Sequence, residues 1–259
     1  MNILDELGAY AKERVAQAKT IKTFNTIKAE AEALPLGNFP FRAALQEKGL
    51  SFICECKKAS PSKGIIAPDF PYVEIAQAYE QAGAACISVL TEPKWFLGSN
   101  QYLKEISQAV QLPCLRKDFT VDGYMLYEAK VLGASAILLI CSLLSDDQLQ
   151  EYQGICQQLG LDAVVETHDA TEVHRALKSG ATIIGVNNRN LQDFSVDTGN
   201  SASLRHLIPP EVIFISESGI KNKEDVQVAR NLGADAVLVG EALMRSSNIG
   251  ATLQEWKSL

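Results

Sequence analysis

An internal repeat constrains the fold of this chain more than any other feature of its sequence. A Gly-Ala pair followed by an apolar stretch recurs at intervals of about 50 residues, the length of two strand–helix units. The four copies are GAACISVL from Gly83, GASAILLI from Gly133, GATIIGV from Gly180 and GADAVLVG from Gly233. Further strand-like stretches lie before and between the copies, at 51–58, 112–119, 161–167 and 211–218. The pattern therefore predicts eight strands.

Stretches with the apolar spacing of amphipathic helices follow these strands, for instance at 71–82, 124–132, 146–159 and 222–232. A glycine directly after a helix suits the C′ position, where the backbone is left-handed. Alternation of strand and helix eight times over about 190 residues indicates an α/β protein of the (β/α)8 class, a TIM barrel. A doubly wound open sheet is the alternative, but evenly recurring units favour a closed barrel.

Length and composition point to one domain. The chain has 259 residues, of which 47% are hydrophobic, and α/β barrels of this length are commonly single domains. We therefore predict one barrel domain over 1–259. Residues 1–48 precede the first strand without a Gly/Ser-rich linker, and we expect them to form an N-terminal helical extension packed on the barrel.

Charge and cysteine usage exclude several classes of protein. A net charge of -7 argues against a nucleic-acid partner. No stretch has the apolar length of a membrane span and the N-terminus lacks the apolar core of a signal peptide, so we expect no membrane partner and a cytoplasmic location. The six cysteines lack metal-binding spacing, which predicts reduced thiols, no disulfide and no metal site. We expect a monomer.

Charged and polar side chains recur where the predicted strands end, and this end of a barrel carries its function. They are Glu55 and Lys57 at the end of the first strand, Arg116, Lys117 and Asp118 at the end of the third, Glu166 at the end of the fifth, Asn187, Asn188 and Arg189 at the end of the sixth, and Glu217 and Ser218 at the end of the seventh. Side chains alternate along a strand, so Glu55 and Lys57 share one face. If Cys54 and Cys56 on the other face point toward the helices, Glu55 and Lys57 point into the barrel mouth.

A single charge beside a strand end is usually a solvated ion pair at the rim, and we interpret Arg116 and Lys58 in this way. Lysines and carboxylates gathered at one mouth are different, because like charges shift each other's pKa and can place a proton donor and an acceptor near neutral pH. The cluster therefore predicts general acid–base chemistry. His168 borders this site, caps a helix or lies at the surface, while His174 and His206 are expected to be structural.

Two glycine-containing turns suggest a phosphate site. ESGI at 217–220 and VGEAL at 239–243 follow the last two predicted strands and open helices. Barrels often bind phosphate there, through glycines that allow close approach of the backbone and through N–H groups at a helix N-terminus.

Several motifs together resemble one family. ECKKASPSKG from Glu55, LTEPKWFLGS, LRKDF, VVETH, IGVNNRNL, SESGI and LVGEALM occur in the order found in indole-3-glycerol-phosphate synthases, and the resemblance covers essentially the whole chain. It implies closure of the indole ring of 1-(2-carboxyphenylamino)-1-deoxyribulose 5-phosphate, with loss of carbon dioxide and water. It also implies a small sugar-phosphate substrate and no metal or organic cofactor.

The resemblance implies roles for the polar residues. Lys117 is the general acid that protonates the ribulosyl carbonyl, and Glu166 handles protons during closure or dehydration. Glu55 and Lys57 complete the polar network, Asn187 and Ser218 orient substrate groups, and Glu217 supports the network. The division of acid and base roles among Glu55, Lys57, Lys117 and Glu166 stays open.

The same resemblance implies the binding residues. It places Ser60 and Arg189 near substrate anions, Phe119, Leu138 and Leu191 around the aromatic ring, and Leu238, Gly219, Gly240 and Glu241 at the binding site, the last three at the phosphate. Some members of the family carry Ser where this chain has Glu241, so we expect Glu241 to offer its backbone N–H and to turn its carboxylate away.

Two alternatives belong to other functional classes. Phosphoribosylanthranilate isomerase is another phosphate-binding barrel, but it needs a Cys/Asp pair rather than Lys117 with Glu166. A noncatalytic sugar-phosphate-binding barrel is the second alternative, and degenerate site residues would favour it. All the expected chemical groups are present in this sequence.

Overall fold

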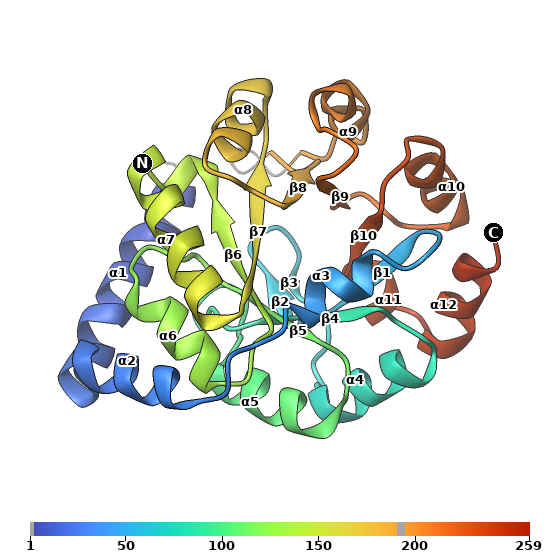
Figure 1. The fold of residues 1–259 in the computed structure, drawn as a ribbon. Helices are drawn as coiled ribbons and strands as arrows, with labels where there is room; N and C mark the ends of the chain where they lie inside the picture. The colour runs from blue at the N-terminus through green and yellow to red at the C-terminus, as the bar shows by residue number, and fades with distance from the viewer. Residues whose placement is uncertain (1–2, 191–194) are drawn as a thin grey trace.

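The computed structural model describes residues 3–190 and 195–259 of the chain. At its centre, eight parallel strands form a closed barrel with helices around it (Figure 1). The strands are β1 (Ser51–Cys56), β4 (Cys86–Leu90), β5 (Cys114–Lys117), β6 (Ala136–Ile140), β7 (Asp162–Thr167), β8 (Ile183–Asn187), β9 (Ile213–Glu217) and β10 (Ala236–Val239). Pairing of β1 with both β4 and β10 closes the barrel. The predicted (β/α)8 fold is confirmed.

Helices connect the strands and cover the outer face of the barrel, while the strands' own side chains fill its interior. Both faces of the sheet are therefore buried, which is why the strand sequences are almost continuously apolar. They are α4 (Tyr72–Gln81), α5 (Asn100–Ala109), α6 (Tyr124–Val131), α7 (Asp146–Leu159), α8 (Ala170–Lys178), α9 (Gly199–Leu204), α10 (Lys223–Asn231), α11 (Glu241–Met244) and α12 (Ile249–Lys257), with short 3-10 helices η1 (Cys141–Leu143) and η2 (Arg205–Leu207). A small hairpin, β2 (Ala59–Ser60) with β3 (Gly64–Ile65), follows β1.

The repeated glycines end helices. Gly83, Gly133, Gly180 and Gly233 follow α4, α6, α8 and α10 with φ angles of 80°, 85°, 90° and 70°. A residue with a Cβ is strained in this left-handed conformation, so glycine is favoured where the chain turns from helix to strand. The Gly-Ala repeat therefore marks the same kind of helix-to-strand turn at four places in the barrel.

Helices α1 (Ile3–Ile21), α2 (Phe24–Ala33) and α3 (Pro40–Leu45) precede the barrel. In Figure 1, α1 and α2 lie outside the barrel beside α6 and α7. Helix α3 packs where β4 and β7 begin, and the Arg42 N–H donates to the Asp162 carboxylate at 2.8 Å. The apolar side chains of these helices join the same hydrophobic core as the strands.

A partly buried ion pair ties α1 to the end of β5. The Arg14 guanidinium donates to both carboxylate oxygens of Asp118, at 2.6 and 3.1 Å. The Thr91 hydroxyl and the Phe119 N–H also donate to Asp118, at 2.6 and 2.8 Å. The Asp118 carboxylate is fully buried, and it lies next in sequence to Lys117. Helix α1 is therefore part of the support of the barrel mouth.

The interpretation of Arg116 as a solvated rim charge is wrong. Arg116 is 1% exposed, and its guanidinium pairs with Glu128 at 2.7 Å and donates to the Met125 carbonyl at 3.0 Å. Alternation along β5 explains this position, because Lys117 faces the barrel interior and Arg116 faces the surrounding helices.

The structure shows the state of the cysteines and the character of the helices. All six cysteines are free and buried, so the expectation of no disulfide is confirmed. Among the described residues, none of the helices combines the length and the apolar character needed to cross a membrane.

Two ion pairs link α1 to the segment after β5, and they differ in burial. Arg14→Gln leaves the buried Asp118 carboxylate without its main partner, so we expect the free energy of unfolding to fall by about 2–3 kcal/mol. Lys19→Gln breaks the pair of Lys19 with Asp122, whose side chains are 36% and 33% exposed, and should cost about 0–1 kcal/mol. Urea unfolding measures both, and equal losses would contradict this ranking.

Candidate active site

A cavity of about 570 Å³ opens at the carboxyl ends of the strands. All the polar residues predicted to be catalytic line it: Glu55, Lys57, Lys117, Glu166, Asn187, Glu217 and Ser218. Of the predicted binding residues, Phe119, Leu138, Arg189, Gly219, Leu238, Gly240 and Glu241 line it as well. Ser60 lies in the β2–β3 hairpin and is not among the lining residues, and Leu191 lies outside the described residues.

The centre of the cavity is a buried cluster of one ammonium and two carboxyl groups. Lys117 on β5 donates to Glu166 Oε2 on β7 at 2.9 Å, and its Nζ lies 3.6 Å from Glu217 Oε2 on β9. Burial lowers the pKa of Lys117, but the charges of Glu166, Glu217 and Glu55 outweigh this effect and raise it above its usual range. Lys117 is therefore a cation in the free site.

The two carboxyl groups titrate differently. Burial raises the pKa of Glu166, but Lys117 and His168 outweigh it and lower the pKa to about 2. Burial raises the pKa of Glu217, and the charges of Glu166 and Glu55 add to this against the pull of Lys117, so that it reaches about 8. At neutral pH the two carboxyl groups together thus hold one proton.

A second ion pair comes from β1. Lys57 Nζ lies 2.6 Å from Glu55 Oε2, and the Ser88 hydroxyl donates to Glu55 Oε1 at 3.5 Å. A Cβ on Gly240 would stand 2.5 Å from Glu55 Oε2 and 3.0 Å from Lys57 Nζ. The lack of a side chain at Gly240 therefore makes room for the pair of Glu55 with Lys57.

Asn187 at the end of β8 connects the cluster to the next loop. Its amide donates to Glu166 Oε1 at 3.1 Å, and its carbonyl oxygen accepts from the Ser218 hydroxyl at 2.9 Å and from the Arg189 N–H at 3.0 Å. Ser218 has a φ of 64°, a conformation uncommon for a residue with a Cβ. Ser218 and Gly219 (φ 98°) together turn the chain sharply over the cavity.

One side of the cavity is apolar, and the sequence interpretation found only part of it. Phe119 and Leu138 were predicted, but Leu90, Phe96 and Ile140 also line this side. The Phe96 and Phe119 rings lie 6.0 Å apart. Glu92 holds the loop of Phe96 by accepting from the N–H groups of Lys94, Trp95 and Phe96 at 2.8, 2.8 and 2.9 Å. The motif LTEPKWFLGS contained this signal, but the pattern does not say which aromatic side chain turns inward.

Basic residues near the loops after β9 and β10 were also missed. Lys221 and Arg245 line the cavity beside Gly219 and Gly240, and Lys63 lines it from the β2–β3 turn. Arg245 Nε donates to Glu241 Oε1 at 3.1 Å, so the Glu241 carboxylate is engaged along its own helix. These basic side chains follow the strand ends by several residues, and alternation along a strand cannot locate them.

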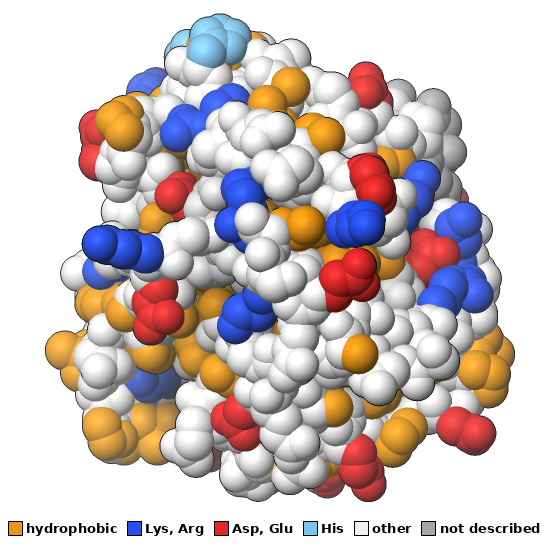
Figure 2. Space-filling view, turned by 90° about the vertical axis from the view of Figure 1, so that its right-hand side faces the viewer, with side chains coloured by type: hydrophobic (Ala, Val, Ile, Leu, Met, Phe, Trp, Pro, Cys, Tyr) orange, Lys and Arg blue, Asp and Glu red, His pale blue; other side chains and the backbone are white. Residues whose placement is uncertain are grey.

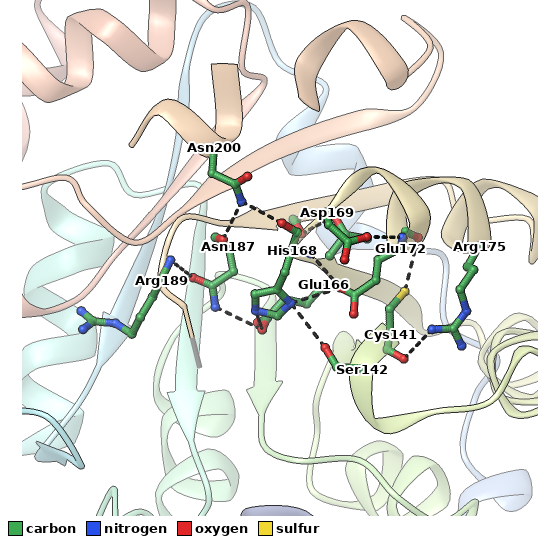
Figure 3. A network of polar contacts seen from close by, with 12 residues as sticks. Cys141, Ser142, Glu166, His168, Asp169, Glu172, Arg175, Asn187, Arg189 and Asn200 are labelled. Carbon is green, nitrogen blue, oxygen red and sulfur yellow. Dashed lines mark hydrogen bonds and ion pairs between the residues drawn. The ribbon is translucent and has the colours of Figure 1, made fainter. Parts of the chain in front are cut away.

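His168 lies behind Glu166, as Figure 3 shows. Its Nε2 is 3.5 Å from Glu166 Oε1, and its Nδ1 is 3.2 Å from Glu172 Oε2 on α8. Asp169, not His168, caps α8, since its carboxylate accepts from the Glu172 N–H at 2.9 Å. Of the alternatives for His168, the position at the border of the site is the one observed.

The described side chains show no metal centre and no basic stripe on the visible face. Among residues 3–190 and 195–259, no group of three His, Cys, Asp or Glu side chains could hold a metal ion. On the face in Figure 2, the described Lys and Arg side chains lie interspersed with Asp and Glu side chains.

The fold and the cavity together define a barrel protein with an acid–base cluster between an apolar side and a basic side. Comparisons with known proteins show which family of barrel proteins the chain resembles. The family model described as indole-3-glycerol phosphate synthase matches residues 4–256. A protein of that name from Ruminiclostridium cellulolyticum is 52% identical to this chain, and the match covers 97% of both chains. One from Endomicrobium trichonymphae is 54% identical, and the match covers 98% of this chain and 99% of that one.

The chain belongs to the indole-3-glycerol phosphate synthase family, a family of enzymes of tryptophan biosynthesis, as the motifs had indicated. Solved structures support the barrel. A 3-hexulose-6-phosphate synthase from Salmonella typhimurium superposes with a TM-score of 0.63 at 14% identity, covering 81% of this chain and 97% of that one. KGPDC from Streptococcus mutans superposes with a TM-score of 0.64 at 11% identity, covering 82% and 97%.

Gly185 within β8 is a further residue that the sequence interpretation missed. A Cβ at Gly185 would lie 2.0 Å from Glu217 Oε1, so the Glu217 carboxyl group rests against a bare backbone. A glycine inside a predicted strand is a signal of such a close approach.

Gly185→Ala should therefore displace Glu217 and reduce the free energy of unfolding by about 1–3 kcal/mol, because the buried cluster must rearrange. Gly154→Ala is the control: no atom lies within 4 Å of a Cβ there, in the middle of α7, and we expect stabilisation by roughly 0.4–1 kcal/mol. Thermal unfolding of both variants checks this. A Gly185→Ala protein as stable as the wild type would contradict the close approach.

Proposed function

We propose that this chain closes the indole ring of 1-(2-carboxyphenylamino)-1-deoxy-D-ribulose 5-phosphate to give indole-3-glycerol phosphate, carbon dioxide and water. The observation that carries the proposal is the Lys117 ammonium group, held by Glu166 and Glu217 in a cavity with one apolar side and one basic side. An ammonium group beside a carbonyl oxygen can protonate it during attack, and carboxyl groups can accept and return protons. The family provides the substrate class.

The shape of the cavity suits the two ends of this substrate. The aromatic ring would lie against the apolar side, with Phe119, Leu138 and Phe96. The phosphate would lie at the other side, near the backbone of Gly219, Gly240 and Glu241 and the side chains of Lys221 and Arg245. Separate sites for the two ends force the chain between them into a folded conformation, with the ring close to the carbonyl carbon.

The remaining binding roles rest on the resemblance to the family. Arg189 lines the cavity and is proposed to meet a substrate anion, together with Ser60 of the hairpin. The Arg189 guanidinium donates to Ser62 Oγ at 3.4 Å, which links the loop after β8 to the turn of the β2–β3 hairpin. We propose that this hairpin covers the bound substrate, and that Leu191 and Leu238 contribute to binding.

The proton count of the reaction fits the cluster. Attack of the ring carbon on the carbonyl carbon requires a proton at the carbonyl oxygen, and departure of carbon dioxide restores the aromatic ring. The hydroxyl group then leaves as water with a second proton, and the carbon beside the nitrogen releases one. Two protons are thus taken up and one is released, which gives a net uptake of one proton per turnover. The site therefore needs both proton donors and a proton acceptor.

These steps divide among the groups in the cavity. Lys117 donates the proton to the carbonyl oxygen, because its ammonium group points into the cavity from β5. Glu166, the ionised carboxylate, accepts the proton that carbon releases. Lys57, held by Glu55 on β1, is a second ammonium group that can donate to the departing hydroxyl. Asn187 and Ser218 orient Glu166 and the substrate hydroxyl groups.

We further propose that the enzyme acts as a monomer in the cytoplasm, without a nucleic-acid partner. The buried, reduced cysteines and the mixed charge on the face in Figure 2 support this setting.

Removal of the acid or of its partner should abolish turnover while the fold is retained. Lys117→Ala and Glu166→Gln are each expected to lower kcat by at least ~100-fold, because each removes a group that transfers a proton. Product appearance by indole fluorescence measures turnover, and circular dichroism checks the fold.

Lys58→Ala is the matched control, since Lys58 is the next residue after Lys57 but is not among those lining the cavity. It should keep wild-type turnover. Equal losses in Lys58→Ala and Lys117→Ala, or no product from folded wild-type protein, would overturn the proposed function.

A further inference from the structure

His168 lies between two carboxylates (Figure 3). On one side its Nδ1 is 3.2 Å from Glu172 Oε2, and its backbone N–H donates to the same oxygen at 2.8 Å. On the other side its Nε2 is buried, has no hydrogen-bond partner, and lies 3.5 Å from Glu166 Oε1. The imidazole is therefore aimed at the catalytic carboxylate from outside the cavity.

The titratable groups that face His168 come from three elements: Glu166 on β7, Glu172 on α8 and, farther away, Glu217 on β9. Ser142 Oγ of η1 lies 3.5 Å from Nδ1. The nearby Arg175 is engaged elsewhere, with Asp146 and the carbonyl groups of Cys141 and Leu144. Burial lowers the pKa of His168, but Glu172 and Glu166 outweigh it and raise the pKa above its ordinary value.

Glu166 and Glu217 share Lys117 but have unequal surroundings. Glu166 also accepts a hydrogen bond from Asn187 and has His168 beside it. Glu217 Oε1 is buried without a hydrogen-bond partner. A carboxylate with more donors and cations around it is the better place for negative charge, and the poorly solvated carboxyl group is the better place for a proton.

We propose that His168, held by Glu172, is a positioning residue that directs the proton shared by Glu166 and Glu217 onto Glu217 and so keeps Glu166 as the ionised partner of Lys117. His168 does not contact the cavity and acts through Glu166. Its catalytic consequence rests on the proposed function, whereas its effect on the two carboxyl groups does not.

Titration of the histidines by NMR tests the charge arrangement without substrate. The chain has only three histidines, so His168 can be followed beside His174 and His206. Glu166→Gln should lower the pKa of His168, because the neighbouring anion is lost, and Glu172→Gln should do the same. Glu217→Gln should leave it nearly unchanged, because Glu217 is already neutral. Unchanged signals of His174 and His206 report an intact fold.

A pKa of His168 that falls as far in Glu217→Gln as in Glu166→Gln would overturn the proposal, since Glu217 would then carry the charge. So would a pKa of His168 that neither Glu166→Gln nor Glu172→Gln lowers. This result is independent of whether the protein forms indole-3-glycerol phosphate.

Kinetics test the catalytic consequence. His168→Asn should move the acid limb of the kcat/KM profile to higher pH and lower kcat/KM about tenfold on that limb, because Glu166 loses a cation and is protonated more easily. The wild-type and variant profiles should converge at alkaline pH, where the wild-type imidazole is also neutral. A merely structural role would lower kcat/KM equally at every pH, which would overturn the proposal.

His174→Asn is the matched control. His174 lies on the same helix, and its Nδ1 lies 2.6 Å from the backbone oxygen of Ala170. This variant should keep the wild-type pH profile. A shifted acid limb in His174→Asn as large as that in His168→Asn would assign the effect to α8 as a whole and overturn the role of His168.

Discussion

The structure depends on the burial of Lys117 between Glu166 and Glu217. Two carboxylates beside one ammonium group would leave an uncompensated negative charge in a poorly solvated place, which is costly. The cost is reduced if one carboxyl group holds a proton, and the pKa of Glu217, raised to about 8, is the result. The same feature that makes burial tolerable gives the site a cation, an anion and a neutral acid close together, with Lys117 Nζ 2.9 Å from Glu166 and 3.6 Å from Glu217.

A barrel is well suited to hold such a cluster, because β5, β7 and β9 contribute one group each from rigid strands. Glycines beside these charged groups leave space for their side chains. Gly185 leaves room for Glu217, and Gly240 leaves room for the pair of Glu55 with Lys57. Arg14 of α1 supports the mouth from outside through Asp118, the residue after Lys117. Helix α1 therefore supports the position of the cavity residues and also contributes side chains to the core.

The sequence predicted the barrel well, because its signals are local. The left-handed turn after a helix requires glycine, and alternation along a strand places Glu55 and Lys57 on the inner face. The same alternation should have placed Arg116 on the helix side, where it is buried with Glu128 rather than solvated. The inward orientation of Phe96 and the arrival of Lys63, Lys221 and Arg245 at the cavity depend on loop conformations, which spacing alone does not determine.

The junction between β7 and α8 shows how a short segment can set the chemistry of a site. Glu166 ends the strand, Asp169 caps the helix, and Glu172 lies in its first turn, where the helix dipole stabilises a negative charge. The cap fixes Glu172 beside His168, and the ring of His168 is thereby held against Glu166. In this segment, residues 166–172, the residues that start the helix also hold His168 beside the Glu166 carboxylate. The asymmetry between Glu166 and Glu217 follows from it, since the turn after β9 offers Glu217 no comparable partner among the described residues.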